Sequence, residues 1–343
     1  MKRASHAAVL AIAIAALLGG SVARLQSPGS FAAEIADLSE PGGFFDTDNL
    51  ISNERSYLHV VPELARRGIH GGAYLGVGPD QNFSYIAEIR PSIAYVIDVR
   101  RDNMLLHLLF KALFAQARTR VEYLALLFGR AVPADLDRWK DTPLERIARY
   151  VDEQSAQQPI EPLRGRLDAT VRSFGIPLSS ADFATIDRFH RRFVDAGLEL
   201  RFQSMGRPPQ FYYPTYRELL LETDGEGHQR NYLASEESFQ FVKGLEAHDK
   251  VIPVVGNVAG PSAMSAVARA LTSRHEQLSA FYVSNVEFYL EREGAYQRFA
   301  TNLSRMPRAS NGVVIRSIFG RGGGSVSEIQ PIAELLAETA IVK

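Results

Sequence analysis

Two glycines in a turn after an apolar run, with an acid at the end of the next apolar run, could bind a nucleoside. Gly76 and Gly78 begin the string Gly-Val-Gly-Pro-Asp-Gln-Asn, and Asp98 stands about 20 residues later, the spacing of nucleotide-binding βαβ units. Such glycines let the backbone approach a ligand, and the carboxylate can accept both ribose hydroxyls. The pattern predicts a nucleoside-type small molecule as ligand. The alternative is that both glycines only shape a turn and that Asp98 is a solvated strand end.

The same turn argues against a dinucleotide. It lacks the third glycine of the dinucleotide fingerprint, and it carries Pro79 and Asp80. An acid at position 80 would repel a pyrophosphate. A ligand without pyrophosphate, such as S-adenosylmethionine, therefore fits the turn better than NAD.

These residues need strands and helices that alternate along the chain. Short apolar runs bounded by turn residues predict buried strands, and helical spacing with capping residues predicts helices between them. The alternation indicates a Rossmann-like α/β domain with a mostly parallel sheet, helices on both faces, and ligands outside the carboxyl ends of the strands. The predicted strands are 73–77, 93–97, 251–255, 279–283 and, at the edge, 313–319; the predicted helices are 52–64, 82–89, 102–114, 121–128, 235–247 and 262–274.

A long helical segment interrupts this alternation. Residues 131–197 keep a helical pattern, and the last helix there has Ser179 and Asp182 spaced as a capping box, with Gly197 at its end. We interpret 131–197 as a helical insertion in a domain that runs from 49 to 320. Residues 321–343 are expected to be a C-terminal tail helix.

The first residues are typical of a targeting segment. Lys2 and Arg3 precede an apolar run from 7 to 18, and Ser21-Val22-Ala23 offers a small-x-small cleavage site. Residues 1–23 are therefore predicted to be a signal peptide or an N-terminal anchor, with 7–23 as the membrane tether. Residues 24–48, with several prolines and glycines, are expected to be a linker. The protein is then exported to the periplasm or outside the cell, or anchored in the inner membrane.

Three strand ends together resemble the successive motifs of class I S-adenosylmethionine-dependent methyltransferases. The motifs are Gly76 to Asn82 with Asp98, then Gly256-Asn257, then Ser284-Asn285, and the resemblance spans roughly residues 70–110 and 250–320. The strings 74–103 and 254–290 also resemble a bacterial family of uncharacterised proteins with a methyltransferase-like fold. The chain departs from the methyltransferase pattern by one missing glycine, by Pro79, and by the absence of an Asn-Pro-Pro motif for amino-group methylation.

The resemblance implies a role for each strand end. Gly76 and Gly78 would approach the methionine part of S-adenosylmethionine, Asp98 would hold the ribose, and Asn257 would stand near the adenine amine. The candidate cofactor-binding residues are thus Gly76, Gly78, Asp80, Gln81, Asp98 and Asn257; the candidates for catalysis near the methyl group are Ser284, Asn285 and Glu287; the substrate pocket is expected to use Tyr212, Tyr213 and Tyr216.

Composition and motifs exclude several other classes. Lys plus Arg number 38 against 39 for Asp plus Glu, so no global basic field favours nucleic acid as a partner. Cysteine is absent, which excludes disulfides, thiolate metal ligands and a cysteine nucleophile. The chain has no Gly-x-Ser-x-Gly, phosphate-loop or His-Glu-x-x-His motif, and its dispersed histidines predict no metal site.

Two functions remain. The first is an S-adenosylmethionine-binding, methyltransferase-like protein of unknown substrate, for which turnover stays an open question. The second is an exported or membrane-tethered binding or interaction protein that keeps the fold without transfer activity. The altered glycine loop and Asn257 favour the second. Export argues against the first, because an exported enzyme would normally lack a supply of S-adenosylmethionine. A membrane-tethered enzyme with its domain in the cytoplasm is a third arrangement, poorly supported by the positive charge at Lys2 and Arg3.

Overall fold

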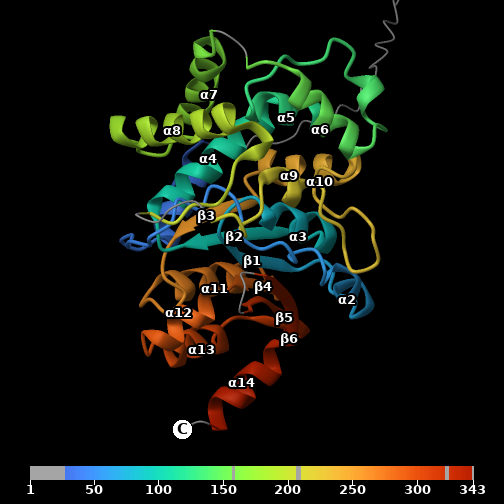
Figure 1. Ribbon diagram of the computed structural model, residues 1–343. Helices are drawn as coiled ribbons and strands as arrows, with labels where there is room; N and C mark the ends of the chain where they lie inside the picture. Colours follow the sequence, from blue (N-terminus) through green and yellow to red (C-terminus); the bar gives the residue numbers. More distant parts are fainter. Residues whose placement is uncertain (1–27, 157–158, 206–209, 321–323, 342–343) are drawn as a thin grey trace, which may run out of the picture.

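A mixed six-stranded sheet forms the centre of the protein (Figure 1). The computed structural model describes residues 28–156, 159–205, 210–320 and 324–341. Five strands run parallel and the last runs antiparallel to its neighbour, so the predicted α/β class with a mostly parallel sheet is confirmed. In chain order the strands are β1 (Ala73–Val77), β2 (Ile93–Asp98), β3 (Val251–Val255), β4 (Leu278–Ser284), β5 (Arg308–Phe319) and β6 (Ser325–Pro331).

The strand order reverses in the middle of the sheet. The spatial order is β3-β2-β1-β4-β5-β6, so the chain moves outward from β1 to β3 and then returns to build the other half from β4. The carboxyl ends of β1 and β4 are therefore neighbours whose connections leave in opposite directions, which opens a crevice between them. The connecting helices are α3 (Gln81–Ile89) after β1, α11 (Ala263–Ser273) after β3, and α12 (Val286–Arg292) and α13 (Tyr296–Ser304) after β4.

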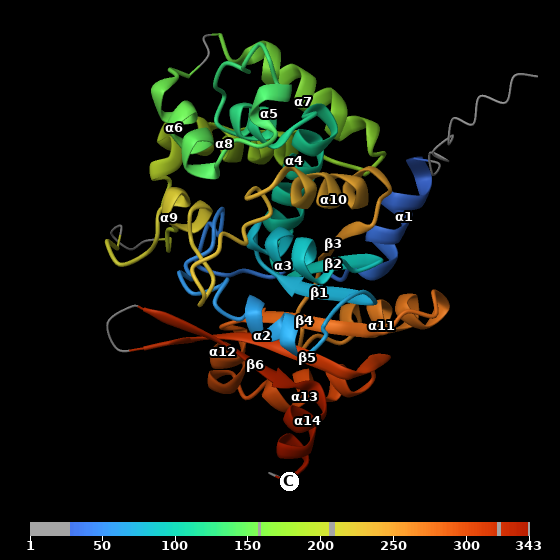
Figure 2. The same ribbon diagram turned by 90° about the vertical axis from the view of Figure 1, so that its right-hand side faces the viewer.

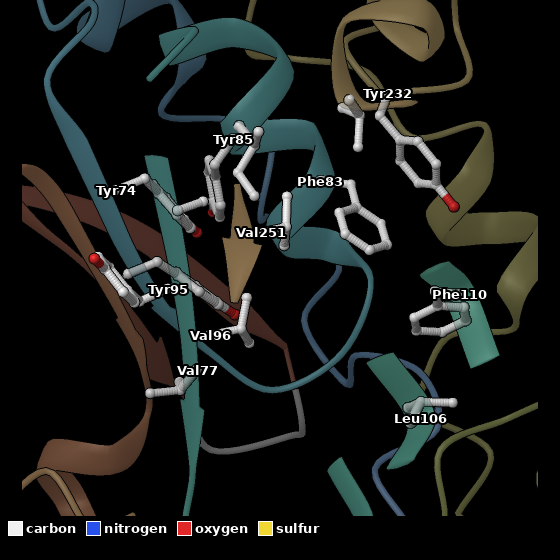
Figure 3. Close-up of a cluster of buried hydrophobic side chains, with 14 of the residues drawn as sticks. Tyr74, Val77, Phe83, Tyr85, Tyr95, Val96, Leu106, Phe110, Tyr232 and Val251 are labelled. Carbon is white, nitrogen blue, oxygen red and sulfur yellow. The ribbon is translucent and has the colours of Figure 1, made fainter. Parts of the chain in front are cut away.

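Helices cover both faces of the sheet (Figure 2). On one face, α3, α4 (Arg101–Gln116) and α10 (Glu236–Ala247) pack against β1 to β3 and against one another; on the other lie α11, α13 and α14 (Ile332–Ile341). Aromatic side chains fill the layer above β1 and β2. The ring of Phe83 lies 5.3 Å from that of Tyr232 and 5.8 Å from that of Phe110, and all three are buried, as Figure 3 shows.

The segment between β2 and β3 is helical, as predicted. The capping box at Ser179 and Asp182 is present in both directions, and Gly197 ends that helix with a φ of +55°, a backbone conformation that favours glycine. After α4 the helices are α5 (Arg120–Leu127), α6 (Leu144–Glu153), α7 (Glu161–Ser173), α8 (Ser180–Ala196) and α9 (Tyr216–Leu220), with short 3₁₀ turns at Asp137–Trp139 and Gly197–Glu199.

The expectation of a linker over 24–48 is wrong from residue 28 onward. Helix α1 (Pro28–Leu38) buries Phe31, Ile35 and Leu38, which share one helical face. The helix packs beside the edge strand β3, and the Glu40 amide then donates to the Val255 carbonyl. The edge of the sheet is thereby covered.

The predicted signal or anchor at residues 1–23 lies outside the described residues. Within the described part of the chain, no helix is long and apolar enough to span a membrane.

Three other predictions need correction. The helix expected over 52–64 is only α2 (Val61–Arg66), preceded by turns, because buried polar groups at 52–56 take the backbone out of helical geometry. The expected edge strand 313–319 is the end of the longer β5, and the true edge is β6. β6 is mostly polar, and its two aliphatic residues, Val326 and Ile329, are three positions apart, which is not the alternation of a strand. The tail helix predicted over 321–343 is therefore wrong for β6, and the helix there is α14.

The turn after β1 is braced from within. The Asn82 side chain folds back over Gly76, where its Nδ2 donates to the carbonyls of residues 77–79 at 2.7 to 3.3 Å. Its Oδ1 accepts from the Tyr74 hydroxyl at 2.8 Å. A Cβ on residue 76 would collide with Asn82 Oδ1 and lie 2.7 Å from the Tyr74 hydroxyl oxygen. This packing accounts for the glycine at position 76.

We expect Gly76→Ala to destabilise the fold, because the added methyl group must displace the buried Asn82 side chain and its hydrogen bonds. Urea denaturation should show a loss of about 2–4 kcal/mol in the free energy of unfolding. Gly165→Ala is the control, since Gly165 is exposed inside α7 and an added Cβ meets nothing within 4 Å. That variant should gain about 0.5–1 kcal/mol. Equal stability of Gly76→Ala and wild type would contradict the packing role.

Candidate functional site

A pocket of about 520 Å³ opens at the carboxyl ends of β1 to β4. It lies at the reversal of strand order, where open α/β sheets bind their ligands, and its volume suits a cofactor-sized molecule. Segments 44–53 and 284–293 supply its walls. Of the residues singled out from the sequence, those that line the pocket are Gly78, Gln81, Asp98, Tyr213, Asn257, Ser284 and Asn285; Gly76, Asp80, Tyr212, Tyr216 and Glu287 do not.

The Gly78 backbone is held from α4 by a histidine. Gly78 has a φ of +84°, which few other residues adopt, and its carbonyl lies 2.9 Å from His107 Nε2. Because the carbonyl can only accept, Nε2 carries the proton. Burial lowers the pKa of His107 to about 4, so the ring is neutral near pH 7 and Nδ1, which has no hydrogen-bond partner, is unprotonated. The histidine thus positions the turn.

Asp98 at the end of β2 is paired with a cation. Oδ1 accepts from the backbone amide of Arg100 at 2.8 Å and from its Nε at 3.1 Å, and Oδ2 accepts from Nη2 at 2.8 Å. The side chains of Arg100 and Asp98 are 7% and 11% exposed. Arg100 Nη1 donates to the carbonyls of Thr47 and Asp48, each at 3.1 Å. The ion pair therefore joins the strand end to the pocket wall.

Asn257, just after β3, belongs to a second hydrogen-bond network that joins distant segments. Its Oδ1 accepts from the Ala259 amide at 2.8 Å, and its backbone amide donates to Glu40 Oε1 at 2.9 Å. Glu40 Oε2 accepts from the amides of Ser262 and Ala263, both at 3.0 Å, at the start of α11. Burial opposes the charge on Glu40, but these hydrogen bonds outweigh it and lower the pKa of that carboxyl.

Asp80 and Tyr216 lie together under the helical segment, away from the pocket. Asp80 Oδ2 accepts from the hydroxyls of Tyr216 at 2.9 Å and Tyr232 at 3.5 Å. Burial raises the pKa of Asp80 to about 6. Of the other tyrosines expected around a substrate, Tyr213 lines the pocket, whereas the Tyr212 side chain is exposed beside it.

The end of β4 presents two of its three candidate residues to the pocket. Ser284, with a φ of +54°, and Asn285 line it. Glu287 instead pairs with Arg316 Nε at 2.8 Å and accepts from the Tyr296 hydroxyl at 3.1 Å. Burial raises the pKa of Glu287.

Glu54 lies behind Ser284 and was missed by sequence reasoning. It is fully buried and accepts from the hydroxyls of Tyr282 and Ser317, both at 2.5 Å, and from Ser284 Oγ. Burial raises its pKa. No motif marks Glu54, because its hydroxyl partners follow it by more than two hundred residues.

Aromatic side chains surround the mouth of the pocket. Phe44 and Phe288 line it although they are 79% and 56% exposed. The rings of Phe45 and Tyr289 meet edge to face at 4.8 Å between them. Apolar rings exposed around a cavity indicate a contact surface for a ligand.

Two buried histidines, His107 and His190, serve as internal hydrogen-bonding groups. His190 Nε2 lies 3.0 Å from the Leu126 carbonyl, as His107 lies against Gly78. In the parts of the chain that the structure describes, no group of three or more His, Asp or Glu could hold a metal ion.

A family model described as a domain of unknown function (DUF7790) matches residues 50–136 and 208–336. The chain belongs to this family. The matched residues include all six strands and the ends that form the pocket floor, so the pocket is built mainly from the family's own domain. Glu40 and the aromatic residues at 44 and 45 lie outside the match. Among curated proteins, no sequence matches this chain.

The buried Asp80 makes stability depend on pH. Its pKa of about 6 in the folded state exceeds its ordinary value of 3.8, so the stability that it contributes is complete below pH 3.8 and is lost as the pH rises through 6. Asp80→Asn keeps an acceptor for Tyr216 without the charge. Urea titrations at pH 4.5 and 7.5 should show the variant gaining about 2 kcal/mol on wild type between the two pH values. An unchanged difference would contradict the raised pKa.

Removal of the Asp98 carboxylate should destabilise the domain, because Arg100 stays buried without its partner. We expect Asp98→Ala to lose about 3–5 kcal/mol in the free energy of unfolding, measured by chemical denaturation. The double variant Asp98→Ala, Arg100→Ala should recover part of that loss. A double variant that is no more stable than Asp98→Ala would contradict the cost of leaving Arg100 buried without its partner.

Proposed function

We propose that this family member binds a nucleoside-type small molecule of the S-adenosylmethionine class and is a methyltransferase-like protein of unknown substrate. One observation carries the proposal: the pocket opens at the reversal of strand order, at the ends of β1 to β4. Parallel strands in the order 3-2-1-4-5 with an antiparallel last strand are consistent with a Rossmann-like, methyltransferase-type domain. Fold alone does not specify activity, so the pocket residues must fit the ligand.

The pocket residues fit a nucleoside, with one restriction. Ile97, Val99 and Val258 give apolar walls beside Asp98 for a planar base. A carboxylate offers about four acceptor positions, and three on Asp98 are taken by Arg100. Asp98 can therefore accept from one ribose hydroxyl, whereas two were expected. When bound, S-adenosylmethionine would supply an activated methyl group; the residues of this chain would hold and orient it.

Specific contacts favour a second candidate, a binding protein without transfer activity. Arg100 neutralises Asp98, and the Asn257 side-chain oxygen already accepts from Ala259. Both of the polar groups expected to hold the nucleoside are thus partly engaged. An exported or inner-membrane-anchored location, which rests on residues 1–23, would suit this candidate. Neither candidate requires a nucleic-acid partner.

Calorimetric titration of the full chain with S-adenosylmethionine and S-adenosylhomocysteine tests the site directly. We expect binding in the micromolar range, and we expect Val99→Trp to weaken it by about tenfold or more, because Val99 is half-buried in the pocket wall and a large ring fills the space for the base. Arg269→Ala, an exposed change on α11 outside this pocket, should bind like wild type. Absence of binding by either nucleoside to wild type would overturn the proposed function.

A further inference from the structure

Glu54 is a buried carboxylate whose neighbours give it hydrogen bonds but no positive charge. Its hydrogen-bond donors are the hydroxyls of Ser284, Tyr282 and Ser317, and no cation contributes to its pKa. Burial of an ionised carboxylate without a counter-charge is costly. Three hydroxyls that all donate to it nevertheless favour the ionised form. The two effects oppose each other, and burial is the larger, so the pKa of Glu54 is raised.

The groups packed around Glu54 cannot supply the missing charge. Tyr74 on β1, Tyr85 on α3 and Tyr282 on β4 face it, and burial raises the pKa of each phenol well above its ordinary value. All three remain neutral at physiological pH. On β5, Ser317 contributes only a hydroxyl, and its Oγ lies 3.4 Å from Ser327 Oγ.

Two polar side chains lead from Glu54 into the pocket. Ser284 Oγ has two acceptors within reach, Glu54 Oε1 and, at the longer distance of 3.3 Å, Asn285 Oδ1. With its only hydroxyl proton given to the nearer Glu54, the lone pairs of its Oγ are available to accept. Gln81 Nε2 donates to the Tyr282 hydroxyl at 3.2 Å, and that hydroxyl in turn donates to Glu54. Both Ser284 and Gln81 line the pocket.

Gln81 also carries an acceptor without a partner. The residue is 6% exposed, and its buried Oε1 has no hydrogen-bond partner. The orientation of the amide is set by the Val77 carbonyl, 3.5 Å from Nε2, because the opposite orientation would place two oxygens together. A buried acceptor without a donor costs free energy unless a ligand supplies one.

We propose that the pocket takes a ligand with a primary ammonium group, which is held by Gln81 Oε1 and Ser284 Oγ and receives its counter-charge from Glu54 behind them. An ammonium has three donors and no acceptor, which matches two acceptors in front of a carboxylate. This inference rests on the proposed function and extends it: the amine would be carried on the nucleoside ligand.

Two nucleosides that differ in the amine test the inference. 5′-Methylthioadenosine has the nucleoside and sulfur alone, whereas S-(5′-adenosyl)-3-thiopropylamine adds an ammonium without a carboxylate. Calorimetry of the full chain should show the amine binding about tenfold or more tightly. Burial raises the pKa of Glu54, and a protonated Glu54 offers no counter-charge, so the preference for the amine should weaken as the pH falls. Calorimetry at several pH values measures that change.

Two serine variants separate the pocket role from the structural one. Ser284→Ala and Ser317→Ala each remove one donor to the same carboxylate, but only Ser284 lines the pocket. We expect Ser284→Ala to lose most of the preference for the amine, and Ser317→Ala to keep it. Glu54→Gln should lose both the preference and its dependence on pH.

The outcomes distinguish the two proposals. Equal affinity of wild type for both nucleosides, or equal effects of Ser284→Ala and Ser317→Ala on the preference, would overturn the ammonium site and leave nucleoside binding intact. Failure of these two nucleosides to bind would overturn this inference, and failure of S-adenosylmethionine and S-adenosylhomocysteine as well would overturn the proposed function.

Discussion

The pocket depends on the buried ion pair between Asp98 and Arg100. Asp98 ends β2, and the same guanidinium reaches the carbonyls of Thr47 and Asp48, so one side chain joins the sheet to the pocket wall. Neither charge can be buried there without the other. The Glu40 contacts repeat the arrangement at the end of β3, where a carboxylate joins the N-terminal segment to the start of α11. The floor of the pocket is family sequence, and these contacts attach a wall to it.

Burial on one or both faces decides which elements could be predicted from the sequence. β1 and β3 are continuous apolar runs buried on both faces, and turn residues bound them, so their limits follow from composition alone. β6 lies at an exposed edge and is mostly polar, without the alternation that marks a strand, so the same residues suit a loop. The apolar face of α1 is only three residues long, between prolines and glycines, and its meaning depends on the distant strand β3.

The candidate site divides in the same way. Spacing located Gly78, Asp98, Asn257 and Ser284, because parallel strands place their carboxyl ends at one edge of the sheet. Spacing could not tell what those residues contact. Arg100 stands two residues from Asp98, but no motif marks it as its partner. Glu40 and Glu54 reach the site across more than two hundred residues of sequence, so only the folded chain connects them to it.

Asp80 and Glu54 show why burial alone does not mark a functional acid. Both are buried, hydroxyls supply the side-chain hydrogen bonds of both, and burial raises the pKa of both. Asp80 is enclosed by Tyr216 and Tyr232 under the helices, with no described contact that leads to the pocket. Glu54 is connected to it twice, through Ser284 and through Tyr282 and Gln81. A charge that arrives in the pocket can therefore act on Glu54 at short range in a medium of low polarity. The ionisation of Asp80 instead affects the stability of the fold.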